Sequence, residues 1–534
     1  MENRILKLFI EKGFLLDREV LNFFNELEYI DLEKEIVNKL SISSNKKIIT
    51  KAILNDNLQK LKPFFNELGD DKKKLVESFL VNFTVSFEIK REVYEESINQ
   101  NLNNVKVLSS PVIASQKLEA RDFIKHFRNR YNFFKKILQE RKELDGLTSI
   151  DKITGNKSFS IIAIVNKKNI TKNKNIILEV EDLTGTTRLL INRNNEDVFE
   201  KSKEILLDDV IGFKCSGTRD FVYVNDLFFP EAFLRERKKA DREVYALFTS
   251  DIHVGSLNFL EKNFEKFISW LNGNCSQEHK KLINKIGYIF LTGDSIDGVG
   301  IFPGQEKFLK IKDIKEQYKK LAYYLSKIPK HIKIIQCPGQ HDAVRVAEPQ
   351  PPIGDDFAEP LHSINNLILV SNPSLIEIEG GINKQGIKVL MYHGASMHGV
   401  VNEIEELRLN NGHHTPAKIV KHLLKRRHLA PSHGDVIYIP NKEKDGLIIN
   451  EIPDIVTTGD LHKPDIDKFN NILIISNSCW QSITPFEEKV GNEPEPCKVN
   501  LLNLKTGEIK VLDFSDDEID EEKCEEEKEE IICK

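Results

Sequence analysis

Six short apolar runs in the second half of the chain constrain its fold more than any other feature. The runs are VYALFTS, GYIFLTG, IKIIQCPG, IKVLMYHG, DIVTTGD and NILIISN, and segments with helical spacing lie between them. Apolar strands that alternate with helices are typical of an α/β domain. Nearly every run is followed at once by Asp, His, Asn or Gly, and open α/β sheets place their chemistry at the carboxyl ends of strands.

The residues that follow five of these runs are of the types that hold divalent metal ions. They are Asp251, His253, Asp294, Gln340, His341, Asp342, His393, Asp460 and His462. Oxygen and imidazole ligands from several strand ends suit a pair of ions such as Mn²⁺, Mg²⁺ or Zn²⁺, which activate a water and clamp a phosphate. A single Asp or His at the end of a strand usually only caps a turn. Capping is an improbable explanation for all of these residues together, because they occur in order at the ends of five strands. Other histidines lack this placement, and we assign them to the surface or to loops: His398, His413, His414, His422, His428 and His433.

Residues 159–229 follow a different pattern. The runs FSIIAIV, IILEVED, TRLLIN, VIGFKCSG and FVYVNDLFF are β-branched or aromatic, with turn residues between them. Five short strands predict a small β-barrel, and an OB-fold has that number of strands. Such a barrel either binds single-stranded nucleic acid or docks a protein. We favour docking, because FVYVNDLFF alternates like a packed strand rather than showing isolated aromatics among arginines.

Composition and charge argue against a disulfide-stabilised, a zinc-ribbon and a membrane-spanning protein. The formal net charge is −6, but the segment 516–530 contains eleven acidic and two basic residues, so the rest of the chain carries +3. The acidic tail is expected to be solvated and disordered, with a docking peptide as the alternative. Seven cysteines without a C-x-x-C pair indicate neither a disulfide framework nor a zinc ribbon. No stretch approaches the roughly 18 uncharged residues of a membrane span. We expect a cytoplasmic protein with no signal peptide and no membrane contact.

The motifs DIH, GDSID, PGQHD, YHG and GDLH, in this order, resemble the calcineurin-like metallophosphoesterase superfamily, whose usual pattern is D-x-H, G-D, G-N-H-D, G-H and G-H-x-H. Within it the chain resembles the small subunits of archaeal family D replicative DNA polymerases. The segments FRNRY, HDAVRVAEPQPP, LLKRRHLAPSHG and SCWQSITPFEEKVGNEPEP carry this second resemblance. It covers the chain from Arg121 to about Phe514 and, more weakly, the N-terminal segment. It implies a small subunit with 3′–5′ exonuclease activity on DNA.

The resemblance also implies a domain order. We expect a helical N-terminal domain at 1–67, a flexible linker at 68–119, a connecting helix at 120–150, an OB-fold at 151–235, an α/β metallophosphoesterase sandwich of the calcineurin-like type at 236–514 and an acidic disordered tail at 515–534.

Each predicted site residue receives a role from the same resemblance. The first metal ion would be held by Asp251, His253, Asp294 and His462. The second, bridged to the first by Asp294, would be held by Gln340, His393 and Asp460. His341 would be the acid beside the scissile phosphate. The two divalent ions are expected to be Mn²⁺, with Mg²⁺, Fe and Zn²⁺ as alternatives.

Two positions depart from the family pattern, and both fall on the second ion. Gln340 stands where Asn is usual, and its extra methylene would displace the carbonyl oxygen. Asp460 stands where His is usual, which keeps a ligand but adds negative charge. The alternative to an exonuclease is therefore a non-catalytic scaffold with a weakened metal site, as in the eukaryotic polymerase B-subunits. A phosphomonoesterase or protein phosphatase is disfavoured, because an added barrel and linker serve a small substrate poorly.

The implied partners are the large catalytic subunit of the polymerase, single-stranded or primer 3′ ends of DNA and, as a further candidate, the sliding clamp. The densest basic cluster of the α/β half is predicted to bind DNA, with a solvated helix face as the alternative: Lys421, Lys425, Arg426 and Arg427. Trp480 and Phe486 follow the last core strand and are predicted to contact the large subunit. For Trp480 a core position is the alternative, and we expect this residue to be shared between the two roles.

Overall fold

The computed structural model describes residues 15–16, 20, 48–49, 105–111, 117–154, 158–218, 221–381, 384–441 and 444–515, except for the side chains of Leu15, Leu16, Ile48, Ile49, Phe486 and Val490. The chain divides into two units, Met1–Asn103 and Asn104–Lys534. In the first unit, strands β1 (Leu15–Leu16) and β2 (Ile48–Ile49) pair in parallel. Most of the predicted helical domain and linker, and the acidic tail after Ser515, lie outside the described residues.

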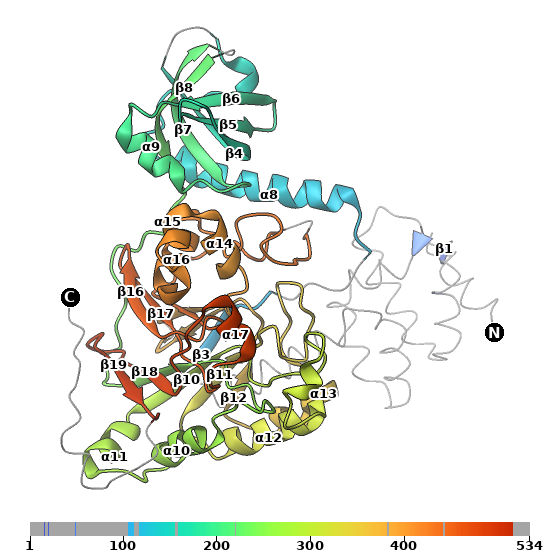
Figure 1. Ribbon diagram of the computed structural model, residues 1–534, viewed down its shortest axis with the longest axis vertical. Coiled ribbons are helices and arrows are strands. Elements are labelled where there is room, and N and C mark those ends of the chain that lie inside the picture. Colours follow the sequence, from blue (N-terminus) through green and yellow to red (C-terminus); the bar gives the residue numbers. More distant parts are fainter. Residues whose placement is uncertain are drawn as a thin grey trace. The chain divides into compact units, whose positions relative to one another are not determined.

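Five strands of the second unit close into a barrel in the order β4-β5-β6-β8-β7 (Figure 1). They are β4 (Phe159–Ile170), β5 (Ile176–Glu181), β6 (Thr186–Ile191), β7 (Val210–Thr218) and β8 (Phe221–Phe228), with helix α9 (Glu196–Lys203) between β6 and β7. Strands β6 and β8 pair in parallel and all other neighbours are antiparallel. Apolar side chains alternate into the barrel, as Leu178 and Val180 do on β5. The predicted five-stranded barrel is confirmed.

Helix α8 (Ala120–Gln139) connects the barrel to the α/β domain. One face of the helix packs on the barrel through Tyr131 and Phe134, and the Tyr131 hydroxyl donates to the carbonyl oxygen of Ile162 at 3.0 Å. On the α/β side, the buried Arg130 guanidinium donates to the Asp445 carboxylate at 2.9 Å. A short 3₁₀ helix, η1 (Ile150–Lys152), precedes the barrel.

The α/β domain contains two six-stranded sheets. The first has the order β12-β11-β10-β9-β18-β19: β9 (Tyr245–Thr249), β10 (Ile286–Thr292), β11 (Lys333–Cys337), β12 (Leu367–Leu369), β18 (Lys498–Asn503) and β19 (Ile509–Asp513). Its first four strands are parallel. The second has the order β16-β17-β15-β14-β13-β3: β3 (Val105–Ser109), β13 (Ser374–Ile378), β14 (Ile387–Met391), β15 (Ile455–Thr458), β16 (Asp465–Phe469) and β17 (Ile472–Ser476).

Strand β3 corrects the predicted linker at 68–119, because residues 105–109 are an edge strand that pairs antiparallel with β13. The run VKVLS is short and surrounded by polar residues, so its alternation is hard to recognise in the sequence. Its partner strand is more than two hundred and fifty residues away, as the pairing of Val105 with Ile378 shows. The strand therefore depends on a pairing that local pattern cannot predict.

Helices cover the outer faces of the two sheets (Figure 1). On the first sheet lie α10 (Glu261–Leu271), α11 (Gln277–Ile283), α12 (Ile314–Ser326) and α13 (Asp355–His362). On the second lie α14 (Met397–Glu403), α15 (Glu405–Leu409) and α16 (Pro416–Arg426). Between the sheets the hydroxyls of Thr292 and Thr457 are 3.5 Å apart. The domain is thus a sandwich of two sheets with helices outside.

Within the described ranges, no helix combines the length and apolar character that a membrane crossing requires.

Candidate metal centre

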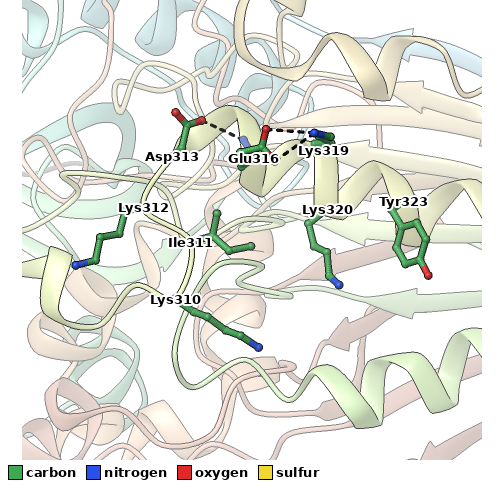
Figure 2. A pocket seen from close by; sticks show the side chains of 8 residues that line it. All are labelled: Lys310, Ile311, Lys312, Asp313, Glu316, Lys319, Lys320 and Tyr323. Carbon is green, nitrogen blue, oxygen red and sulfur yellow. Dashed lines mark hydrogen bonds and ion pairs between the residues drawn. The ribbon is translucent and has the colours of Figure 1, made fainter.

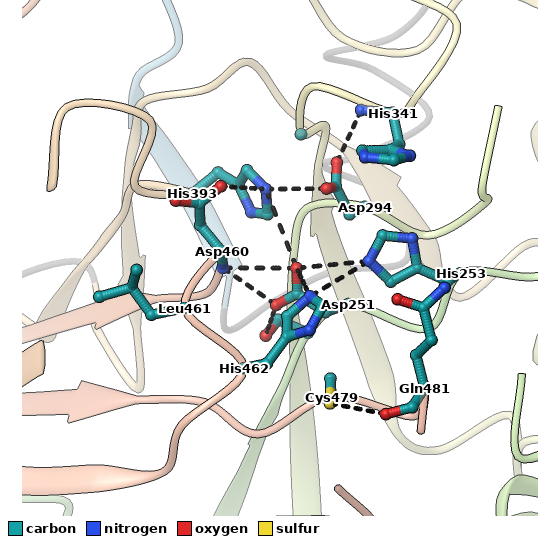
Figure 3. A network of polar contacts seen from close by, with 12 residues as sticks. Asp251, His253, Asp294, His341, His393, Asp460, Leu461, His462, Cys479 and Gln481 are labelled. Carbon is teal, nitrogen blue, oxygen red and sulfur yellow. Dashed lines mark hydrogen bonds and ion pairs between the residues drawn. The ribbon is translucent and has the colours of Figure 1, made fainter. Parts of the chain in front are cut away.

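The loops after β9, β10, β11, β14 and β15 bring the predicted ligands together at one edge of the sandwich (Figure 3). Asp251, His253, Asp294, His393 and His462 are buried, and Gln340, His341 and Asp460 are half-buried. Three groups of these side chains have ligand atoms within 4.8 Å of one another: Asp251, His253 and His462; His253, Asp294 and His341; and Asp251, Asp294 and His393. Because Asp251 and Asp294 each belong to two groups, either carboxylate is placed to join two ions.

The backbone of these loops is strained at the ligands themselves. Non-glycine residues with positive φ are Asp251 at 51°, His253 at 53°, Asp294 at 46°, Asp460 at 68° and His462 at 55°. Such conformations cost of the order of 1 kcal/mol or more each, and they persist where the surroundings impose them. Their concentration here indicates that the fold maintains this arrangement of side chains against a local cost.

Two glycines allow the loops to approach closely enough. A Cβ on Gly293, where φ is +84°, would lie 2.1 Å from Nδ1 of His393. A Cβ on Gly339 would lie 2.2 Å from Oδ1 of Asp294 and 2.6 Å from Nε2 of His393. Any side chain at these two positions would displace a predicted ligand, so the glycines of the GD and PGQHD motifs are packing requirements of the centre.

The first histidine pair has its ring tautomers set by two acidic residues. Nδ1 of His253 lies 3.1 Å from Oδ1 of Asp297, and Nδ1 of His462 lies 2.8 Å from Oε1 of Glu487. Each Nδ1–H therefore donates to a carboxylate, which leaves Nε2 as the metal-binding atom. The two Nε2 atoms lie 3.3 Å apart, and Nε2 of His462 is 3.4 Å from Oδ1 of Asp251.

His393 is oriented in the same way by the backbone. Its Nδ1–H donates to the carbonyl oxygen of Thr292 at 2.9 Å. Its Nε2 lies 3.3 Å from Oδ2 of Asp294, 3.8 Å from Oδ1 of Asp460 and 3.9 Å from Oδ1 of Asp251. Burial by itself would lower the pKa of His393, but the surrounding carboxylates, with Asp294 first, raise it well above its usual value. The site thus stabilises a positive charge at this point.

The donor atoms fit divalent ions. Nε2 of His393 and Oε1 of Gln340 are buried and have no hydrogen-bond partner among the described residues, and both belong to the predicted second set. In the first set, two imidazole lone pairs face each other, an arrangement that is repulsive without a proton or a cation between them. Mixed nitrogen and oxygen donors suit Mn²⁺, Fe or Zn²⁺ better than an oxygen-only ion such as Ca²⁺.

His341 lies at the mouth of the centre. Its backbone N–H donates to Oδ1 of Asp294 at 2.8 Å, and its Nδ1–H donates to the carbonyl oxygen of Asp297 at 2.7 Å. Burial lowers the pKa of His341, but the charge of Asp294, the hydrogen bond to the carbonyl oxygen of Asp297 and the charge of Asp297 together raise this pKa above its usual value. The ring is thus held with Nε2 free for a ligand or substrate.

The two departures from the family pattern contact each other. Nε2–H of Gln340 donates to Oδ1 of Asp460 at 3.2 Å. Nε2 of His398, on α14, lies 3.3 Å from Oδ2 of Asp460. His398 is half-exposed, as predicted for a surface residue, but its side chain also reaches a predicted ligand. His428 is also corrected: it is buried and contacts Asp445 at 2.9 Å.

The basic cluster predicted to bind DNA has partners within the chain. Arg426 is buried and forms an ion pair with Asp209 at 2.9 Å. Lys425 pairs with Glu204 at 2.6 Å, Lys421 pairs with Asp467, and Arg427 donates to the carbonyl oxygens of Ile449 and Asn450. The prediction of a DNA contact is therefore wrong for the buried Arg426. The sequence alone could not reveal these ion pairs, because Glu204 and Asp209 come from the barrel, far from α16 along the chain.

Trp480 is fully buried, which corrects its predicted role as a partner contact. Its ring packs against Phe264 at 4.9 Å and Phe267 at 5.4 Å between centroids, and its Nε1–H donates to the Thr249 hydroxyl at 2.9 Å. Trp480 therefore belongs to the core of the α/β domain. Phe486 lies in helix α17 (Pro485–Val490), and its side chain is outside the described residues, so its role stays a prediction.

Sequence reasoning missed Asp297 and Glu487, the two acidic residues that orient the ligands. Asp297 lies in GDSIDG, three residues after a predicted ligand. Glu487 forms a capping box with Thr484 at the start of α17, and T-x-x-E is a recognisable signal for a helix start. Neither signal points to a metal ligand, since the contact with histidine depends on distant loops.

A Glu487→Gln substitution is expected to weaken metal binding by about 10- to 100-fold, the usual effect of removing a carboxylate behind a histidine ligand. Glu487 accepts from Nδ1–H of His462 through Oε1 and from the N–H of Thr484 through Oε2, whereas glutamine has a single acceptor oxygen and keeps only one of these two contacts. Circular dichroism of the metal-free variant checks that the fold stays intact. Titration calorimetry with Mn²⁺ measures the change. Glu488→Gln, at an exposed position one residue on, is the matched control. Equal affinities for both variants and the parent chain would contradict the role of Glu487.

Comparison with known proteins agrees with the motif resemblance. A family model for the B-subunits of DNA polymerases alpha and epsilon matches residues 246–468. The DNA polymerase II small subunit of Pyrococcus furiosus is 38% identical over 397 residues, which is 73% of this chain and 63% of that protein. The protein of the same name from Methanothermobacter thermautotrophicus is 37% identical over 399 residues, covering 74% of this chain and 80% of that protein. The match thus spans less than two thirds of the Pyrococcus relative.

Among solved structures, an archaeal phosphodiesterase is 13% identical and aligns with 50% of this chain and 99% of its own, at a TM-score of 0.26. A TM-score this low does not by itself establish a common fold. The sequence relatives do establish a family, because they align with most of both chains at more than a third identity. The chain belongs to the family of DNA polymerase II small subunits.

Proposed function

We propose that this chain is the proofreading small subunit of a replicative DNA polymerase, which removes nucleotides from DNA 3′ ends at a two-metal phosphodiesterase centre. The observation that carries the proposal is the common orientation of His253, His393 and His462. Each donates through Nδ1 to an acceptor behind it and directs Nε2 towards the carboxylate of Asp251, at 3.4 to 4.0 Å. Structural histidines have no need of this arrangement, whereas metal ligands do.

The remaining site residues have roles that follow from their positions. Bound divalent ions, which we propose to be Mn²⁺, supply Lewis acidity and make water nucleophilic at neutral pH. Asp251 and Asp294 hold the negative charge that such ions require. His341 stands beside Asp294 with its ring fixed by Asp297, so its Nε2–H is placed to protonate the leaving oxygen.

We further propose that the α/β sandwich is of the calcineurin-like type and that the barrel is an OB-fold. The barrel order β4-β5-β6-β8-β7, with one parallel pair and α9 between its third and fourth strands, supports the latter. Its function would be to dock the large catalytic subunit. The ion pairs from α16 to Glu204 and Asp209 support this role, because they fix the barrel to the α/β domain as one surface. No described residue argues for a sliding-clamp contact, so we do not extend the proposal to one.

A scaffold with a weakened second metal site is the other candidate. The hydrogen bond from Nε2–H of Gln340 to Asp460 favours it, because this contact occupies one oxygen of a predicted ligand carboxylate. The contact of His398 with Asp460 acts in the same direction.

The test measures the rate at which the chain, bound to its large subunit, digests single-stranded and mismatched 3′ ends of DNA in the presence of Mn²⁺. If digestion is slow because the second ion binds weakly, Gln340→Asn with Asp460→His is expected to raise the rate about tenfold or more, by restoring a neutral imidazole ligand. Gln385→Asn, at an exposed position away from the centre, is the control for handling the variants. No digestion by either the parent or the double variant would leave the scaffold function.

A further inference from the structure

A surface of exposed apolar side chains lies next to the candidate metal centre. Its members, which we call the loop surface, are exposed over 39% to 57% of their area: Leu257, Val299, Ile301, Phe302 and Phe308. All except Leu257 belong to the loop between β10 and α12. Large apolar side chains that gather on a surface mark a place where another molecule binds.

The loop surface begins directly at His341. A Cβ on Gly298, where φ is +72°, would lie 2.4 Å from the carbonyl oxygen of His341 and 2.9 Å from the side chain of Ile301. The side chain of Ile301 and the backbone carbonyl of His341 therefore both pack against Gly298. At the other end of the loop, the N–H of Leu257 donates to the carbonyl oxygen of Phe308 at 2.8 Å. The loop surface is thus continuous with the loop that carries His253.

A buried glutamine locks this loop to a metal-ligand histidine. Nε2–H of Gln305, which is 1% exposed, donates to the carbonyl oxygen of Asp297 at 2.8 Å, and its Oε1 accepts from the N–H of Ile301 at 2.9 Å. Asp297 in turn orients His253. The position of the loop surface relative to the metal centre is therefore built into the fold.

Beyond Phe308 the surface leads into a hollow of ≈ 810 Å³ rich in lysine (Figure 2). Four lysines and two carboxylates line it: Lys310, Lys312, Lys319, Lys320, Asp313 and Glu316. Lys310 and Lys320 share a single carboxylate, that of Glu261, at 2.8 and 2.9 Å, and Lys319 pairs with Glu316 at 3.3 Å. The four lysines exceed the carboxylates of Glu261, Asp313 and Glu316 by one positive charge, which suits a phosphate backbone.

We infer that the loop surface and the lysine hollow hold the single-stranded 3′ end of DNA as it reaches the metal centre. This inference rests on the proposed function. Unpaired bases pack on Phe302 and Phe308, and the phosphates that follow lie against the lysines. Aromatic platforms beside a positively charged groove are how proteins bind single strands regardless of sequence.

The first experiment measures binding of fluorescein-labelled oligothymidylate to the full chain by anisotropy, without divalent metal so that no digestion occurs. The variant Phe302→Ala with Phe308→Ala is expected to raise Kd about tenfold or more, since each lost stacking contact weakens single-strand binding severalfold. Phe233→Ala is the matched control, because Phe233 is 61% exposed and lies outside this surface. An unchanged Kd for the double variant overturns the inference.

The second measurement is the salt dependence of the same binding. Lys312→Gln is expected to lower the slope of log K against log salt by roughly 0.7, the value for one phosphate contact on a single strand. An unchanged slope would show that the lysine hollow does not contact the phosphates of the single strand, and that part of the inference would be wrong.

Hydrolysis of bis(4-nitrophenyl) phosphate with Mn²⁺ separates this inference from the proposed function. This diester is too small to reach the loop surface, so the Phe302→Ala and Phe308→Ala variant should hydrolyse it at the parent rate. If the parent chain does not hydrolyse this diester, the proposed function fails. The anisotropy measurement still decides whether the loop surface binds single-stranded DNA. If the double variant binds DNA normally but loses the large subunit, the loop surface docks protein and the inference is wrong.

Discussion

Asp294→Asn is expected to reduce DNA hydrolysis by at least about 10³-fold, because the substitution removes one of the two carboxylates placed to join both ions. The amide has the same shape and can still accept from the backbone N–H of His341, a contact of 2.8 Å in the parent chain. The variant therefore tests charge at this position with little change in packing.

The stability of the metal-free variant is expected to be lower than that of the parent chain. Oδ2 of Asp294 lies 3.3 Å from Nε2 of His393, and its negative charge is the first cause that raises the pKa of His393, so the substitution leaves a buried positive charge without its main partner. A ligand at 100 times its Kd raises the free energy of unfolding by about 2.7 kcal/mol, and this Mn²⁺-induced rise in Tm should largely disappear. Asp356→Asn, on the exposed face of α13, is the control. Digestion at the parent rate by Asp294→Asn would refute the assigned role.

The ligand positions could be predicted because their signals are local. Each of Asp251, Asp294, His393 and Asp460 follows an apolar run within a few residues, and parallel strands bring their carboxyl ends to one edge. The five barrel strands were predictable for a related reason, since each carries its own alternation and turn residues.

The remaining features depend on contacts between segments that are far apart in sequence. Arg426 reads as part of a basic surface until the barrel places Asp209 beside it. His398 reads as a loop residue until β15 places Asp460 at 3.3 Å. Strand β3 has too few residues to show a period, and only its pairing with β13 defines it. In each case the chemical type of the residue is evident from the sequence, while the topology decides what the residue contacts.

Trp480 is the clearest example of a residue whose type is evident from the sequence but whose contacts are not. An aromatic residue after the last core strand, in SCWQSITPF, is equally consistent with an interface and with a core position. The structure places it against Phe264, Phe267 and Phe514, with no exposed area. Its backbone N–H also donates to the carbonyl oxygen of Asp251 at 2.9 Å, so this core supports the first ligand loop.

Trp480→Ala is therefore expected to destabilise the α/β domain by about 3–5 kcal/mol, the usual cost of truncating a fully buried large aromatic side chain. In a domain of this size the corresponding fall in Tm is roughly 6–20 °C, measurable by calorimetry of the isolated chain. Trp480→Phe fills most of the cavity and should lose much less. At a temperature where both variants are folded, their affinity for the large subunit should equal that of the parent chain, because a buried ring cannot touch a partner. An unchanged Tm combined with weaker capture of the large subunit would instead return Trp480 to the interface.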